Sequence, residues 1–162
     1  RKIFAPIWIK GPIKDFVSRD VVIVGDAAGQ SKPTTAGGIY SCAMGGLLAG
    51  NAITKYLETN EHSQLQQYQK LWHDKFGKEF EKQRLARKIL EKVDNKTVDM
   101  IFDTITPEIT SEISNKDDFD FHATSIVKLL GMRKSISAAQ NIMSAEIKRL
   151  LTNYSHTKSS KV

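Results

Sequence analysis

The chain has little of several residue types, and each shortage excludes a class of protein. Among its 162 residues it has one cysteine, Cys42, with 4 prolines and 10 glycines. One cysteine excludes an internal disulfide framework and a multi-cysteine zinc or iron–sulfur site, and so few glycines and prolines exclude a fibrous or low-complexity chain. The longest weakly polar run, residues 37–53, is short for a membrane span. The N-terminus lacks the layout of a secretory signal, so we expect a cytoplasmic location.

Charge is not of one sign either. Lys and Arg number 24 and Asp and Glu 18, which gives a net charge of +6. The densest basic cluster, residues 82–92, is interleaved with glutamates. We therefore expect no nucleic-acid partner, because such partners favour a gathered basic patch. The cluster is either a solvated helix face or a peripheral contact with anionic lipid headgroups.

The order of patterns predicts an α/β segment followed by a mainly α one. Residues 3–9 and 21–24 are apolar and β-branched; the second run, without alternation, predicts a strand buried on both faces of a parallel sheet. A small-residue loop follows, and then a helix over 38–59. Beyond it, amphipathic patterns predict a long helix from Ser63, a short one from Asn95 or Thr97 to near Pro107, a loop at 115–118, and helices at 123–130 and from Ser135. The predicted domains are residues 1–60 and 61–155, with a flexible tail at 156–162.

The strongest chemical signal is Gly25-Asp26, directly after the predicted strand. Ligands of open α/β sheets bind at this edge. There Asp26 offers a carboxylate that accepts hydrogen bonds from hydroxyl groups, and the small residues after it allow close approach to a phosphate. Gly37-Gly38 then opens a helix whose first N–H groups favour an anion. The alternative is a tight crossover in which the glycines serve packing alone.

The run VVIVGDAAGQSKPTTAGGIYSCAMGGLLAG resembles the second flavin-binding motif of the geranylgeranyl reductase family, in the para-hydroxybenzoate hydroxylase-like flavoprotein superfamily. The stretches LQQYQKLWHDKFGKEFEKQRLARKIL and DDFDFHATSIVKLL resemble later parts of that family. The resemblance implies the last strands, loop and helix of an FAD-binding Rossmann-like domain plus a C-terminal helical domain. Ala36 departs from the family pattern, which more often has glycine there.

The resemblance also implies roles for single residues. Asp26 would bind the ribityl hydroxyls of FAD, and Gly25 would permit the turn. Pro33 would lie beside the flavin ring. The cofactor-binding residues so implied are Gly25, Asp26, Ala27, Ala28, Gly29, Pro33, Gly37, Gly38 and Ile39. No catalytic residue is identified. The four histidines have no metal-ligand spacing, so no metal site is expected.

The implied function is reduction of carbon–carbon double bonds in isoprenoid chains, with an isoprenoid lipid as substrate and NAD(P)H or a ferredoxin as electron donor. Because the chain begins at Arg1 and contains no G-x-G-x-x-G after a strand, we expect it to be the C-terminal portion of a longer reductase that binds FAD weakly alone. Two alternatives remain: an aromatic monooxygenase of the same superfamily, and a non-catalytic helical interaction domain with a vestigial flavin loop.

Overall fold

The computed structural model describes residues 2–92, 94–103, 105–116 and 120–121. Their described structure is mostly helical with one small sheet. The predicted helices at 123–130 and from Ser135, and the tail at 156–162, lie outside the described residues. The chain divides into two compact units, residues 1–85 and residues from Ala86 onward.

The sheet is a short antiparallel hairpin. Strand β1 (Val17–Ser18) pairs with strand β2 (Val21–Val22), with Val17 opposite Val22. Arg19 lies in the turn with a φ of 51°, and it reverses the chain so that β2 meets the strand just before it. The prediction of a longer strand buried on both faces is therefore wrong for this structure, since Val21 is 59% exposed. The predicted strand over residues 3–9 is also wrong, because this exposed segment has no regular structure.

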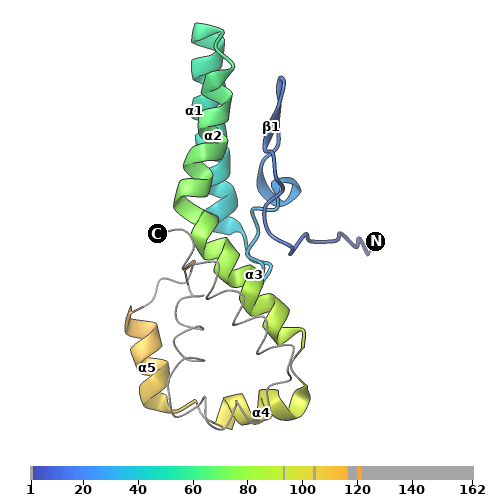
Figure 1. Cartoon of the computed structure of the whole chain (residues 1–162), viewed down its shortest axis with the longest axis vertical. Helices are drawn as coiled ribbons and strands as arrows, with labels where there is room; N and C mark the ends of the chain where they lie inside the picture. Colours follow the sequence, from blue (N-terminus) through green and yellow to red (C-terminus); the bar gives the residue numbers. More distant parts are fainter. Residues whose placement is uncertain (1, 93, 104, 117–119, 122–162) are drawn as a thin grey trace, which may run out of the picture. The chain divides into compact units, whose positions relative to one another are not determined.

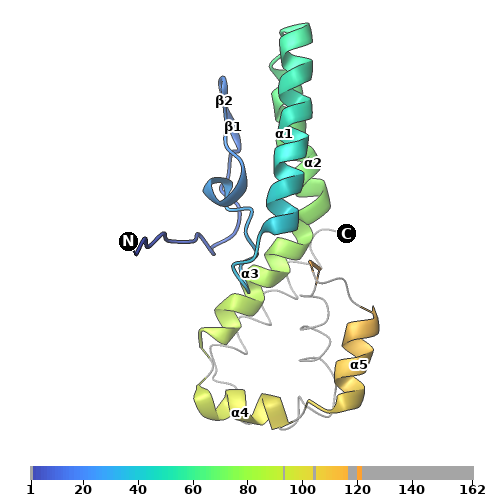
Figure 2. The ribbon, with the colours of Figure 1, turned by 180° about the vertical axis from the view of Figure 1, so that it is seen from behind.

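Helix α1 (Ile39–Thr59) confirms the helix predicted over 38–59, and helix α2 (Ser63–Trp72) begins at the predicted Ser63. The two helices run side by side as a hairpin in both views (Figures 1 and 2). Asn60 ends α1 in the left-handed conformation, and its N–H donates to the Tyr56 carbonyl at 2.7 Å. Gly45, Ala49 and Ala52 are small buried residues of α1, and Gly45 lies against the Gln30 side chain.

A π-helical turn, η2 (His73–Gly77), continues α2 into helix α3 (Lys78–Leu90). The aromatic residues of this run form the core of the first unit: Tyr68, Trp72, Phe76 and Phe80 are at most 1% exposed. Phe16, just before β1, packs among them, with its ring centroid 5.3 Å from that of Trp72. The backbone N–H of Phe16 donates to Gln69 Oε1 at 2.6 Å. The hairpin is thereby attached to α2.

Two helices of the second unit are described. Helix α4 (Asn95–Asp103) begins at Asn95, one of the two predicted starts, and ends before the predicted stop near Pro107. Helix α5 (Pro107–Lys116) was not predicted. Proline is favoured at the first position of a helix because its missing N–H would have no partner there. Pro107 therefore begins a helix as well as following one, and the loop predicted at 115–118 is wrong for its first two residues.

Candidate functional site

The Gly25-Asp26 pair forms a tight turn. Residues Gly25–Ala28 make a 3₁₀ turn, η1, and Gly29 closes it with a φ of 69°. The Gly29 N–H donates to the Asp26 carbonyl at 3.0 Å. A Cβ at Gly29 would lie 2.3 Å from the Gly11 carbonyl oxygen, so only glycine fits there. The close approach of the Gly11 backbone therefore explains why position 29 requires glycine.

Gln30 holds the turn against both helices, and sequence analysis did not identify it. Its Oε1 accepts from the Gly25 N–H at 2.8 Å, and its Nε2 donates to the Tyr68 hydroxyl at 2.7 Å. The Tyr68 hydroxyl in turn donates to the Ile23 carbonyl at 2.9 Å. From α1, the Ser41 hydroxyl donates to the Gln30 carbonyl at 2.6 Å. Gln30 is fully buried, so the position of the turn depends on one amide side chain.

The Asp26 carboxylate is on the surface of this buried framework. The Ser31 hydroxyl donates to Asp26 Oδ1, and the Cys42 thiol approaches the same oxygen at 3.7 Å. No donor from the described part of the chain reaches Oδ2. Burial raises the pKa of the Cys42 thiol, and the negative charge of Asp26 raises it further. Asp26 therefore keeps one oxygen able to accept a hydrogen bond from a ligand.

A pocket of about 350 Å³ adjoins Asp26. It is lined by Pro6, Trp8, Ile13, Asp26 and Ala27. Three of these side chains come from the segment before the hairpin and two residues come from η1. Asp26 is the one charged residue among these five, so the pocket suits a mainly apolar group that also carries a hydroxyl.

The residues predicted to bind a cofactor differ in exposure. Asp26, Ala27 and Ile39 are exposed, whereas Ala28, Gly29 and Pro33 are buried. Gly25, Gly37 and Gly38 are partly exposed. The exposed members lie where a ligand can reach them. The buried members support the loop.

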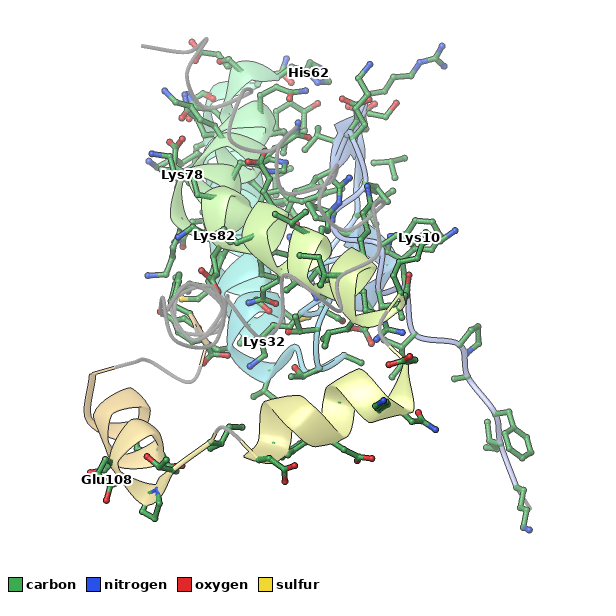
Figure 3. All side chains as sticks on the ribbon, turned by 60° about the horizontal axis from the view of Figure 1, so that its bottom comes forward. Lys10, Lys32, His62, Lys78, Lys82 and Glu108 are labelled. Atoms are coloured by element: carbon green, nitrogen blue, oxygen red, sulfur yellow. The ribbon has the colours of Figure 1, made fainter. Side chains whose placement is uncertain are left out.

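The loop enters α1 at Gly38, where no side chain caps the helix. Positive charge is close by, because a Cβ at Gly37 would lie 3.9 Å from Lys32 Nζ. Lys32 is only 3% exposed; Figure 3 labels it in the loop before α1. The uncapped N–H groups and the ammonium both favour an anionic group at this end of the loop.

Within the described ranges no three His, Cys, Asp or Glu side chains gather as metal ligands would. His73 is half-buried against Phe16, with 4.9 Å between ring centroids, and burial lowers its pKa. None of the helices described here has the length and apolar character to cross a bilayer.

Comparison with known proteins identifies archaeal relatives. Digeranylgeranylglycerophospholipid reductase of Methanocaldococcus jannaschii is 38% identical over 85 residues, which are 51% of this chain and 22% of that protein. An uncharacterized protein of the same organism is 43% identical over 70 residues, 43% of this chain and 18% of that protein. Digeranylgeranylglycerophospholipid reductase 1 of Methanococcoides burtonii is 39% identical over 71 residues, 43% of this chain and 17% of that protein.

The matches therefore span about a fifth of each of these relatives. No protein-family model matches the chain, and no solved structure matches it. Several relatives from separate archaeal species are named digeranylgeranylglycerophospholipid reductases. The similarity confirms, over about half of this chain, the predicted resemblance to the geranylgeranyl reductase family.

Proposed function

We propose that this chain is part of an FAD-dependent oxidoreductase that reduces carbon–carbon double bonds of geranylgeranyl chains in membrane lipids. The observation that carries the proposal is the exposed Asp26 carboxylate, which lies on a turn whose Gly25 N–H donates to the buried Gln30 side chain. The comparisons support it, because relatives at 33–39% identity are named digeranylgeranylglycerophospholipid reductases. A reduced flavin supplies the hydride equivalent that alkene reduction requires.

The described residues fit a flavin in three ways. Oδ2 of Asp26 is available to a ribityl hydroxyl, and charge-assisted hydrogen bonds of this kind are strong. The start of α1 at Gly38, which no side chain caps, offers backbone N–H groups to an electron-rich ring edge. The Gly37 N–H already donates to the Thr35 hydroxyl at 3.3 Å. The Lys32 ammonium beside Gly37 stabilises negative charge there. In this proposal Ala28, Gly29 and Pro33 support the loop, and the exposed residues make the contacts.

We also propose that the Gly-Asp turn belongs to a Rossmann-like flavin domain, of which residues 1–60 form a part. Residues 61–155 would form a helical domain. The proposal also assigns an isoprenoid lipid as substrate and NAD(P)H or a ferredoxin as donor. Peripheral contact with anionic lipid is proposed for the basic cluster at 82–92. These assignments come from the family resemblance and the names of the relatives.

Cofactor binding is tested by equilibrium dialysis of the chain against FAD. Replacing Asp26 with Asn removes a hydrogen bond to a charged group, which is worth about 1.5–3 kcal/mol. We therefore expect binding to weaken by about 10- to 100-fold. Asp20→Asn is the matched control, because Asp20 is an exposed carboxylate whose hydrogen-bond and ion-pair partners among the described residues are Tyr56 and His62 alone. Equal effects of the two substitutions would contradict the proposal.

Activity is tested with the longer reductase of which this chain is expected to be a part, supplied with a reduced flavin and a digeranylgeranyl glycerophospholipid. The chain alone is expected to be inactive. The expected product is heavier by two hydrogens for each double bond reduced. Oxygen consumption with insertion of an oxygen atom into an aromatic substrate would instead indicate a monooxygenase. A chain that binds no flavin but retains a protein partner would indicate the interaction domain.

A further inference from the structure

Trp8 occupies an unusual position for a large aromatic side chain. It is 48% exposed, yet its polar edge is already satisfied, because Nε1 donates to the Gly11 carbonyl at 2.7 Å. This hydrogen bond fixes the plane of the indole. The side chain therefore presents a fixed apolar surface with no free donor.

That surface lines the same pocket as Asp26. The pocket of about 350 Å³ has Trp8, Pro6 and Ile13 on one side and the Asp26 turn on the other. Its volume is at the lower end of the range for small-molecule sites, so it accommodates one ring system and not a whole dinucleotide. A molecule that fills it contacts both Trp8 and Asp26.

A cation adds to this arrangement. Lys10 Nζ lies 5.6 Å from the centroid of the Trp8 ring, and Figure 3 labels Lys10 in the segment before the hairpin. The pocket thus combines an aromatic surface, an acceptor for hydroxyls and a nearby positive charge. A planar heterocycle attached to a hydroxylated, phosphate-bearing chain matches all three, whereas a bare hydrocarbon chain matches only the first.

We propose that Trp8 is a cofactor-contact residue whose indole packs against the flavin that Asp26 holds. This inference rests on the proposed function and adds a residue outside the Gly-Asp motif. Its partner in binding is Asp26: the carboxylate orients the hydroxylated chain, and the indole excludes water from one side of the bound group.

The test uses the two tryptophans of the chain, which serve as probe and control. Both indole N–H groups are hydrogen-bonded, Trp8 to Gly11 and Trp72 to the Ser41 carbonyl at 3.0 Å. The ¹⁵N-labelled chain gives one indole resonance for each, assigned with Trp8→Phe. Trp72 is fully buried. On titration with FAD we expect the Trp8 resonance to move by several line widths and the Trp72 resonance to stay.

Affinity gives a second readout, with equilibrium dialysis on the same samples. Stacking on an aromatic side chain is a substantial contribution to binding of a planar base, so Trp8→Ala is expected to weaken FAD binding by about tenfold. Trp8→Phe keeps an aromatic surface and is expected to stay within about threefold of the parent. An unchanged Trp72 resonance in each variant shows that the core is intact.

The outcomes separate this inference from the proposed function. If FAD binds and Asp26→Asn weakens it, but Trp8 does not respond, the inference is overturned and the proposed function stands. If a detergent-solubilised isoprenyl alcohol moves the Trp8 resonance and FAD does not, the pocket holds lipid and the inference is overturned. If FAD does not bind at all, both are overturned.

Discussion

Gly45 and Gly46 are neighbours on α1 with opposite surroundings. A Cβ at Gly45 would lie 2.2 Å from Gln30 Oε1, whereas a Cβ at Gly46 would have no atom within 4 Å. Both positions are helical. Replacing each with alanine therefore compares a steric clash with a pure gain in helix propensity.

The magnitudes follow from the contacts of Gln30. Alanine is favoured over glycine inside a helix by about 1 kcal/mol, so Gly46→Ala should stabilise the fold by about that amount. Gly45→Ala forces the Gln30 amide away from the Gly25 N–H and the Tyr68 hydroxyl. Leaving buried groups without their partner costs about 1–3 kcal/mol each. Gly45→Ala should then destabilise the fold by about 1 kcal/mol or more.

The assay is urea unfolding at pH 7, followed by far-UV circular dichroism. A double-mutant cycle isolates the cause, since it measures the coupling between two side chains. In a Gln30→Ala background the obstructing amide is absent, and Gly45→Ala should change from destabilising to neutral or stabilising. Equal effects of Gly45→Ala and Gly46→Ala, or a cost of Gly45→Ala that persists without Gln30, would refute the reasoning.

Three further predictions concern the loop and its supports. Ala36 has a φ of 59°, where a side chain costs about 1–2 kcal/mol, so Ala36→Gly should stabilise the fold by up to about 1 kcal/mol and raise Tm; a lower Tm would contradict this. Burial raises the pKa of Tyr68 to about 12, above its ordinary value of about 10. The stability gained from the neutral phenol is therefore present below pH 10 and lost as pH rises toward 12; urea unfolding across this range should show a shallower decline in Tyr68→Phe, and an equal decline in both proteins would count against it. Burial raises the pKa of the Cys42 thiol most, and the charge of Asp26 raises it further. Asp26→Asn should therefore speed alkylation of Cys42 by iodoacetamide at pH 8, because the thiolate is the reacting form. An unchanged rate would show that Asp26 does not act on Cys42.

Helices were predictable from sequence where one face carried a consistent pattern. The start of α2 at Ser63 and the extent of α1 match the structure because apolar or small residues recur at helical spacing along a single face. The strands were not predictable in the same way. The run of residues 21–24 has strong β propensity, but propensity does not determine which strand it pairs with. The turn at Arg19 reverses the chain and pairs this run with the residues just before it. The sequence analysis uses Pro107 only to end a helix, although proline also favours the first position of a helix, where α5 has it.

The candidate site was predictable to the extent that it depends on exposed chemistry. Asp26 stands out in the sequence because a carboxylate follows a glycine after an apolar run. Gln30 does not stand out, since a lone amide in a loop resembles any solvated residue until its partners are seen. Its one indirect sign is Gly45, because a glycine inside a helix is unfavourable unless close packing requires it. Trp8 does not stand out either, because the sequence predicts a strand over residues 3–9.

The π-helical turn η2 has a consequence for how α3 is oriented about its own axis. Trp72, Phe76 and Phe80 recur every four residues, yet the ring centroids of Phe76 and Phe80 lie only 5.2 Å and 5.0 Å from that of Trp72. In a regular α-helix a spacing of four drifts by about 40° at each step, and the wider turn offsets that drift. Removing one residue from His73–Gly77 would leave a continuous helix but rotate all later side chains by about 100°. Gln83 would then lose Thr34, whose hydroxyl donates to it at 3.3 Å. The number of residues in this turn, independently of their identity, sets which side of α3 faces the loop that follows Asp26.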